Sequence, residues 1–290
     1  MLKYGKIVEA IVSDENNDYY YVQYEGITFE LDKNNVDESL KLGDVVEGII
    51  YEDKNRKRVF QTQLPDIRPG YYGWGNVVAS RKDLGVFVDI GLHNKDIVVS
   101  LDVLPDNRNQ WPKKGDKLFL SYVVDDKNRF WGQLAHEEDF KDQFIFAPKR
   151  LMNQEVEARI HTLKLVGAQA ITQEGFSAFI HESEWVTPPR LGELIKARVI
   201  DVRGNGSSIN LSTKPRAHEV IDEDALMIQT ILERKPNHFL ALHDKSSPDQ
   251  IRTELGISKG QFKRAIGSLL KNDIITQKIG EGIYLNISKE

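Results

Sequence analysis

Three copies of one plan of short strands, about seventy residues apart, constrain the fold of this chain more than any single motif. Each copy opens with a strand-like run, at residues 5–10, 75–80 and 155–160. A glycine followed by an acidic residue comes 37 to 40 residues later, at Gly43, Gly115 and Gly192. Each copy closes on a last short strand, at residues 59–62, 130–133 and 209–212. A fixed period of short strands and turns indicates tandem copies of one small β-domain.

The second copy shows its strand order most clearly. Residues 75–80 and 84–90 are expected to form two antiparallel strands, and residues 97–99 a short third strand. A longer loop then precedes two further strands over residues 117–124 and 129–134. Five short strands with a longer excursion between the third and the fourth is the order of an OB-fold barrel, whose open face commonly binds single-stranded nucleic acid.

After residue 215 the apolar period changes from two to about 3.6, which indicates helices. Carboxylates at 222–224 precede a helix over 225–233, and Ser246-Ser247-Pro248 gives a cap with proline in the first turn of a second helix. Gly256-Ile257-Ser258 ends that helix and caps a third one. The expected buried stripe of this third helix consists of Phe262, Ile266, Leu269 and Leu270.

Alternating residues return over 274–279, followed by a glycine-rich turn and by Ile283, Leu285 and Ile287 facing one way. Two helices joined by a short turn and followed by a hairpin are similar to a winged-helix domain. The predicted architecture is therefore mainly β, with three five-stranded OB-fold barrels before an α+β winged-helix domain. The expected limits are 1–65, 66–136 and 151–214 for the barrels, 137–150 for a linker and 222–288 for the winged helix.

Composition fits a soluble multidomain protein, because 40% hydrophobic and 29% charged residues are typical of globular chains rather than disordered ones. The absence of cysteine excludes disulfides and thiolate metal sites, and it suits a reducing cytosol. Residues 1–10 lack the basic start and apolar stretch of a leader, and no run reaches the roughly 18 apolar residues that span a bilayer. We expect a cytoplasmic protein with no membrane partner.

The net charge of -5 does not exclude nucleic acid, because the acidity is confined to one region. Residues 1–65 carry 8 Lys and Arg against 13 Asp and Glu, a difference of -5, and the other copies are near neutral. A basic stripe on one face of the later copies is compatible with these counts. The first copy should contribute least to binding, since its carboxylates repel phosphates.

Residues 85–90, with Gly75 before them and Gly115-Asp116 after them, resemble the S1 RNA-binding domain, a subclass of this barrel. In this second copy Leu84 stands where many S1 domains place an aromatic residue, and Val99 where they place a histidine.

The third copy matches S1 domains at residues 179–183, where such domains carry a histidine on the RNA face, here His181. Gln169 and Asn210 stand where an aromatic residue and an arginine are usual. The first copy is the most divergent, with Tyr19-Tyr20-Tyr21 in the middle of its sheet among acidic residues.

Three S1-like barrels followed by one winged helix resemble the conserved virulence factor B family of bacterial RNA-binding regulators. The resemblance covers nearly the whole chain. It implies a protein that binds RNA and influences the expression of other genes, including virulence factors in pathogens of that family.

The candidate RNA contacts are Trp74, Phe87, Arg129, His181, Lys259, Lys263 and Arg264. All but Arg129 have a structural alternative. Phe87 either stacks on a base or belongs to the barrel core, and His181 either stacks or bonds to its own loop. Trp74 either contacts RNA or, like Tyr72, closes the barrel end. The cations of the winged helix, Lys259, Lys263 and Arg264, either bind phosphate or form an ordinary solvated helix face.

Three classes of function fit these patterns. The first is a regulator that binds single-stranded RNA with little sequence specificity. The second is a DNA-binding transcription regulator that uses the helix over 258–272, where Gln261 and Arg264 are nearly alone in suiting base edges. The third is an RNA-processing accessory factor or nuclease, because barrels of this class often accompany nucleases.

The sequence favours the non-catalytic alternatives. Small modules account for the whole chain, and it contains no phosphate-binding glycine loop, metal-binding carboxylate cluster or nucleophile motif. The run His136 to Asp139 suggests a metal site, but consecutive residues rarely point at one ion, so a solvated linker is favoured. We therefore expect no enzyme activity, no metal and no cofactor, and the sequence does not predict the oligomeric state.

Overall fold

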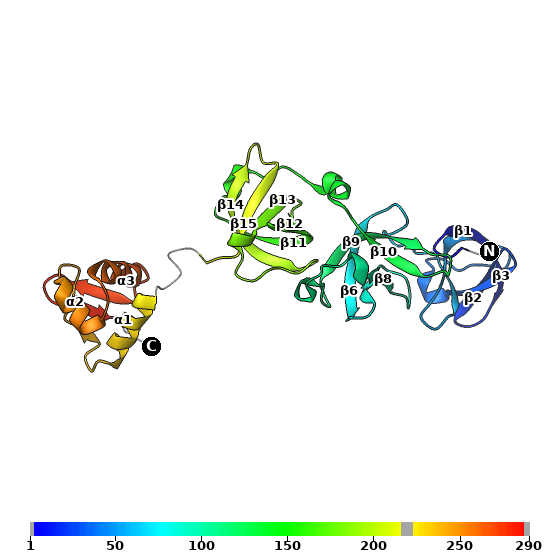
Figure 1. Cartoon of the computed structure of the whole chain (residues 1–290). Coiled ribbons are helices and arrows are strands. Elements are labelled where there is room, and N and C mark those ends of the chain that lie inside the picture. The colour runs from blue at the N-terminus through cyan, green and yellow to red at the C-terminus, as the bar shows by residue number, and fades with distance from the viewer. Residues whose placement is uncertain (1–2, 216–222, 287–290) are drawn as a thin grey trace. The chain divides into compact units, whose positions relative to one another are not determined.

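The computed structural model describes residues 3–215 and 223–286 and confirms three closed five-stranded barrels followed by a helix-containing domain (Figure 1). The chain divides into two compact units, residues 1–214 with the barrels and residues 215–290 with the winged helix. No helix in the described ranges is long and apolar enough to cross a membrane.

The first barrel contains β1 (Ile7–Glu15), β2 (Tyr19–Tyr24), β3 (Ile27–Asp32), β4 (Val45–Glu52) and β5 (Arg58–Gln61). The second contains β6 (Gly73–Arg81), β7 (Gly85–Asp89), β8 (Ile97–Ser100), β9 (Lys117–Val124) and β10 (Phe130–Leu134). The third contains β11 (Glu155–Lys164), β12 (Gly167–Thr172), β13 (Ser177–His181), β14 (Leu194–Arg203) and β15 (Ser208–Ser212). In each barrel the third and fifth strands pair in parallel and all other neighbours are antiparallel.

The glycine of the repeated Gly-acidic turn is required by the backbone. Gly43, Gly115 and Gly192 have φ values of 91°, 94° and 80°, a region that other residues rarely adopt. Their amides donate to the carbonyl oxygens of Val12, Val77 and Ile160, one in each first strand. A register shift directly after each of these three residues marks a β-bulge at the same place in every barrel.

The first two barrels share one hydrophobic core, whereas the third has a cluster of its own. At the junction of the first two, the Tyr51 hydroxyl lies 2.9 Å from Oε1 of Gln61 and 3.0 Å from the carbonyl oxygen of His93. Nδ2 of Asn94 donates to Asp53 over 2.6 Å. These buried polar groups are satisfied across the junction, which fixes the two barrels against each other.

The junction of the second and third barrels is built around the same Gly-acidic turns. The Lys117 amide donates to the carbonyl oxygen of Gly192 over 3.1 Å. Arg190 pairs with Asp116 of the second barrel at 3.2 Å and with Glu193 of its own barrel at 2.9 Å. Arg190 therefore forms ion pairs with both carboxylates at this corner.

The segment 137–150, expected as a linker, is anchored by the buried residues Phe140 and Ala147, while most of its other residues are exposed. It contains the 3-10 helices η4 (Glu137–Gln143) and the start of η5 (Lys149–Leu151), and Phe140 is 1% exposed. The Phe140 ring stacks on His161 with centroids 4.0 Å apart. A single aromatic residue thus anchors a stretch that looks polar in the sequence.

The winged-helix domain contains α1 (Glu223–Arg234), β16 (Phe239–Leu240), α2 (Pro248–Leu255), α3 (Lys259–Lys271), β17 (Ile275–Lys278) and β18 (Gly282–Leu285). Ser247 and Ser258 cap α2 and α3 as predicted, and Gly256 ends α2 with φ of 71°. The short strand β16, which pairs with β18, was not predicted. Leu270 is 36% exposed, so its predicted place in the buried stripe is wrong, and Ala265 is buried instead. Residue 222 and Ile287 lie outside the described ranges.

Candidate nucleic-acid interface

Strand pairing places three residues side by side on the second, third and fifth strands of every barrel, and we call each set the central row. The rows are Tyr21, Glu30 and Val59 in the first barrel, Phe87, Val98 and Trp131 in the second, and Gln169, Phe179 and Asn210 in the third. The same outer face therefore carries different chemistry in the three barrels.

Phe87 lies on the outside of the second barrel. Val86 and Val88 are fully buried, whereas Phe87 between them is only half-buried, as strand alternation requires. Trp131 is half-buried on the same face and pairs with Val98, the residue that Phe87 also pairs with. Two aromatic side chains thus flank one valine, which is the kind of surface on which bases stack.

Asp125 organises the edge of this aromatic surface. It accepts hydrogen bonds from Nε1 of Trp131 at 3.1 Å and from Nε of Arg129 at 2.8 Å. The Arg129 amide, with these side-chain donors, holds the pKa of Asp125 well below its usual range. The Arg129 guanidinium lies 5.2 Å from the Trp131 ring centre, so this candidate is an exposed cation that is already paired with a carboxylate.

Phe179 is the aromatic residue of the central row in the third barrel. Its ring extends over Gly167, where an added Cβ would come within 2.6 Å of Phe179 Cζ. Gln169 and Asn210 flank it, and their amide nitrogens donate to Glu137 at 2.7 Å and to Asp201 at 3.3 Å.

His181 caps the 3-10 helix η6 (Glu182–Glu184). Its Nδ1 accepts from the Ser183 amide at 3.1 Å and lies 2.8 Å from the Ser183 hydroxyl, while the residue is exposed. The ring centre is 6.4 Å from that of Phe179 in an edge-on arrangement. His181 is therefore both bonded to its own loop and placed beside an outward aromatic ring.

The residue of the second barrel that matches His181 is Ser100, so the assignment of this position to Val99 is wrong. Ser100 pairs with Gly85 as His181 pairs with Gly167, and Ser100 also caps the following 3-10 helix, η2 (Leu101–Val103). Val99 is fully buried and faces the core.

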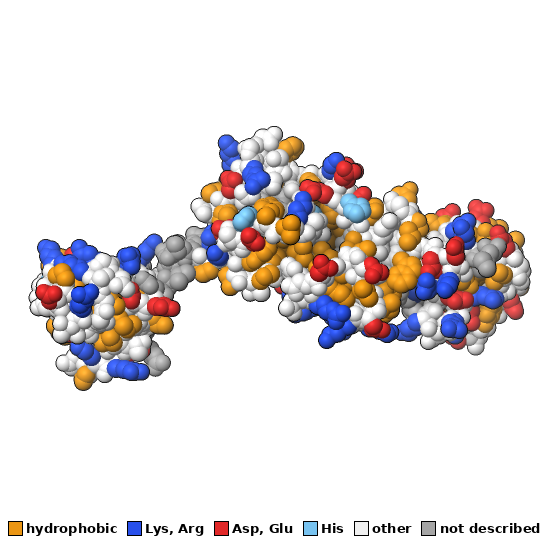
Figure 2. Space-filling view, viewed as in Figure 1, with side chains coloured by type: hydrophobic (Ala, Val, Ile, Leu, Met, Phe, Trp, Pro, Cys, Tyr) orange, Lys and Arg blue, Asp and Glu red, His pale blue; other side chains and the backbone are white. Residues whose placement is uncertain are grey.

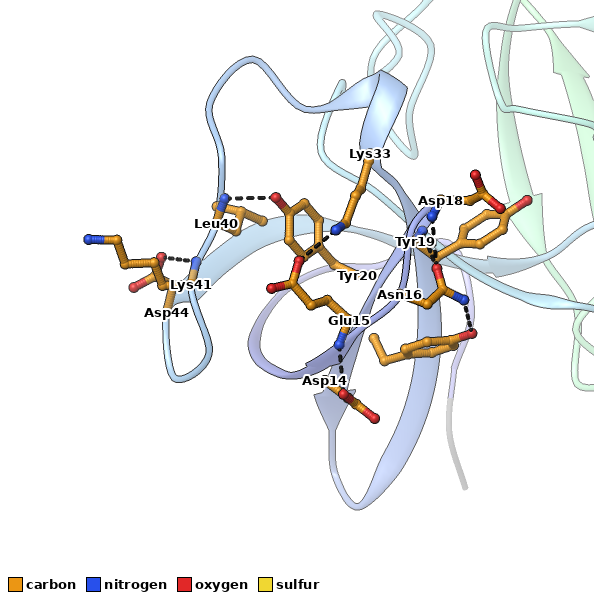
Figure 3. Close-up of polar contacts among 11 residues, drawn as sticks. Asp14, Glu15, Asn16, Asp18, Tyr19, Tyr20, Lys33, Leu40, Lys41 and Asp44 are labelled. Atoms are coloured by element: carbon orange, nitrogen blue, oxygen red, sulfur yellow. Dashed lines mark hydrogen bonds and ion pairs between the residues drawn. The ribbon is translucent and has the colours of Figure 1, made fainter.

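The first barrel places carboxylates on this face. Glu30 occupies its central row, and Asp32 stands at the capping position of His181, where it accepts from the Asn34 amide of η1 (Lys33–Asn35). Lys57 pairs with Glu30 at 3.4 Å. Tyr20 points inward, and its hydroxyl accepts from the Leu40 amide at 3.1 Å (Figure 3). Acidic groups, which repel phosphate, thus replace the aromatic and histidine residues of the third barrel.

Trp74 packs at the junction of the second and third barrels. Its ring centre is 5.1 Å from that of Phe119 and 6.1 Å from that of Phe140, and the Arg159 guanidinium lies 5.9 Å from it. Trp74 is therefore half-covered by protein rather than free on the central-row face. Tyr72 also contacts Phe119, with ring centres 6.0 Å apart.

The run His136 to Asp139 forms helix-capping bonds. Oδ2 of Asp139 accepts from the His136 amide at 2.7 Å, and Glu137 pairs with Lys164 at 2.8 Å. Within residues 3–215 and 223–286 no group of three or more His, Asp or Glu side chains is arranged to hold a metal ion.

On α3, Lys263 and Arg264 are exposed and Lys259 is half-buried. None of the three forms an ion pair with another described residue. Oε1 of Gln261 accepts from the Ser258 backbone amide at 3.0 Å, so the side chain of Gln261 is engaged in capping the helix. Figure 2 shows Lys and Arg side chains on the visible face of this domain and hydrophobic side chains gathered over the second and third barrels.

Four family models match successive parts of the chain. They are the S1 domain over residues 4–63, the CvfB first S1-like domain over 72–133, the second domain of the virulence regulatory factor CvfB over 140–215, and the CvfB-like winged helix domain over 226–285.

Relatives align over nearly the full length. The uncharacterized protein YitL of Bacillus subtilis is 37% identical over 92% of this chain and 89% of its own. Conserved virulence factor B of Staphylococcus aureus is 32% identical over 89% of this chain and 85% of its own. A crystal structure of a multidomain protein with nucleic acid binding domains from Streptococcus pneumoniae superposes with a TM-score of 0.71 at 43% identity, covering 98% of each chain. The chain belongs to the conserved virulence factor B family.

Proposed function

We propose that this chain is a non-catalytic regulator of gene expression that binds single-stranded RNA with little sequence specificity. The observation that carries the proposal is the central row of the second and third barrels, which presents Phe87, Trp131 and Phe179 outward. Aromatic side chains on an open barrel face stack on unpaired bases, and stacking is tolerant of sequence. The names of the relatives, a virulence factor and a protein with nucleic acid binding domains, support the regulatory role.

The test is a titration of the pure full-length protein with single-stranded RNA, single-stranded DNA and duplex DNA, each at two salt concentrations. We expect single-stranded RNA to bind most tightly, with affinity falling at higher salt by a log-log slope of about 0.7 per phosphate contacted. Tighter binding of duplex DNA would favour the alternative of a transcription regulator.

That alternative uses α3 as a recognition helix. Exposed Lys263 and Arg264 favour it, whereas the engagement of Gln261 in the helix cap leaves few side chains for base edges. We propose that Lys259, Lys263 and Arg264 instead contact phosphates. Replacing all three with Ala should weaken RNA binding and flatten its salt dependence by up to about 2 in slope, without changing base preference. A changed base preference in this variant would contradict the phosphate role.

We also propose that the protein performs no catalysis, against the alternative of a nuclease. Labelled RNA incubated with the protein and Mg²⁺ or Mn²⁺ should remain intact. Cleavage that co-purifies with the protein and disappears when its own carboxylates are replaced would overturn this part of the proposal.

A further inference from the structure

A cleft of about 440 Å³ lies between the second and third barrels, apart from the central rows. Its cationic side chains are Lys117 on β9, the fourth strand of the second barrel, and Arg159 on β11, the first strand of the third barrel. Trp74 forms part of its wall, and the loop around Gln173 closes it on the side of the third barrel.

Arg159 is a cation that lacks an acidic partner in this cleft. Its Nη1 donates to the carbonyl oxygen of Gly192 over 2.9 Å, and its guanidinium lies over Trp74. No carboxylate of residues 3–215 forms an ion pair with it. Burial lowers the pKa of Arg159, against the opposing influence of Asp116. A partly desolvated cation is stabilised by an anion that enters the same space.

The nearby carboxylates of Asp116 and Glu193 form ion pairs with Arg190 and not with Arg159. Both oxygens of Asp116 accept from Arg190 at 3.2 Å, and Glu193 pairs with the same guanidinium at 2.9 Å. The acidic side chain that lines the cleft is Glu174, which is exposed. Two cations thus face one carboxylate among the described lining residues.

Lys117 is the second cation of the cleft. It is exposed, and its side chain makes no ion pair with the described residues. Its amide is fixed to Gly192, the residue whose carbonyl oxygen also binds Arg159. The Arg159 guanidinium and the Lys117 backbone are therefore held by the same carbonyl oxygen.

The barrel fold does not demand charge at these positions. In the first barrel the strand positions of Arg159 and Lys117 correspond to Ile11 and Val45, which pair with each other and are 52% and 61% exposed. The same corner is thus apolar in one barrel and cationic where two barrels meet.

We propose that the cleft between the second and third barrels binds a backbone phosphate of single-stranded nucleic acid through Arg159 and Lys117. This inference rests on the proposed function. The planar guanidinium presents several donors to phosphate oxygens, and the lysine adds a mobile charge. The site supplies phosphate contacts in addition to base stacking on the central rows.

The test compares full-length variants with a single-stranded RNA oligonucleotide over a range of salt concentrations. Lys117→Gln should lower affinity about five-fold at 0.1 M salt and reduce the slope by about 0.7. Lys117→Gln with Arg159→Gln should lower affinity about 25-fold and reduce the slope by about 1.4. Arg159→Lys should retain most of the slope, and Glu174→Gln should increase affinity. The control is Lys196→Gln, which removes an exposed charge that pairs with Glu157 at 3.7 Å outside the cleft.

The outcomes separate the two proposals. Absence of RNA binding by the unmodified protein would overturn the proposed function. Normal RNA binding with an unchanged slope in both Lys117→Gln and the double variant would overturn the phosphate site alone. Because Lys117 is exposed, its single variant keeps the test valid if Arg159→Gln disturbs folding. A parallel titration with inorganic phosphate tests whether the cleft is instead a site for free anions. Such a site would bind phosphate, while the Lys117 and Arg159 variants would leave RNA affinity unchanged. This result would also overturn the proposal.

Discussion

The first and third barrels have the same strand order, the same bulge and the same turn, yet they present opposite chemistry on the same face. Glu30 and Asp32 stand in the first barrel where Phe179 and His181 stand in the third. These residues point outward and contribute little to the core, so the fold tolerates either set. The comparison teaches that a barrel of this class is a scaffold and that binding depends on a few outward positions.

The largest expected effect comes from removing the aromatic residues of the binding faces. Phe87→Ala and Phe179→Ala should each weaken single-stranded RNA binding by roughly 1–3 kcal/mol, because each loses one stacked base. Tyr21→Ala, at the first-barrel position that matches Phe87, is the control and should bind as the unmodified protein does. Fluorescence anisotropy measures all three. If Tyr21→Ala weakened binding as much as Phe179→Ala, the proposed difference between the barrels would be wrong.

The first and third barrels also differ at the β-bulge of their first strands. The bulge residue is Ser13 in the first barrel and His161 in the third. Burial against Phe140 lowers the pKa of His161 to about 4, with Glu137 opposing and Lys164 reinforcing the shift. Between pH 6.5 and 4 the unfolded chain therefore holds a proton on this side chain that the folded chain lacks. The free energy of unfolding should fall by up to about 1.4 kcal/mol per pH unit on acidification through this range.

His161→Phe retains the ring stacking but cannot titrate. Thermal unfolding at several pH values should show a weaker acid dependence for this variant than for the unmodified protein. Equal acid dependence in His161→Phe and the unmodified protein would exclude His161 as a source.

Neutralising the first barrel should produce a smaller gain. Glu30→Gln with Asp32→Asn removes two carboxylates from its face and keeps a side chain at position 32 that can cap η1. If RNA approaches this face, affinity should rise a few-fold at low salt and the gain should vanish at high salt. A gain that persists at high salt would show that repulsion is not the cause.

The smallest expected effect separates the two roles of His181. His181→Asn retains a cap for η6 but removes the ring beside Phe179, so RNA affinity should fall modestly with little change in thermal stability. His181→Ala should lower both. Loss of stability without loss of affinity in His181→Ala would leave His181 with the capping role alone.

The sequence predicted the barrels well because glycines and alternation are local signals. Gly43, Gly115 and Gly192 are required by positive φ, and a repeat of such residues identifies the turn without any knowledge of packing. The caps at Ser247 and Ser258 are local in the same way.

The side chains on the outer faces of the barrels were harder to predict, because strand register decides which residues point outward. A one-residue slip moves a side chain to the other side of a strand, and this is how Val99 was assigned to the position of Ser100. Trp131 and Phe179 were missed as binding candidates because their neighbours on the central row are distant in sequence. Phe140 lies within a charged run, so only the packed structure shows that it anchors residues 137–150.

The continuous core of the first two barrels has a consequence for how the molecule unfolds. Opening the first barrel would uncover Tyr51 and Tyr122, whose rings are fully buried and whose hydroxyls reach His93 and Gly5 across the junction. Amide hydrogens of both barrels should therefore exchange as one cooperative foldon, whereas the third barrel, with its separate core, can exchange independently. The acidic barrel is then a folding partner of its neighbour, and deleting it would leave the buried Tyr122 hydroxyl without its bond to the Gly5 carbonyl oxygen.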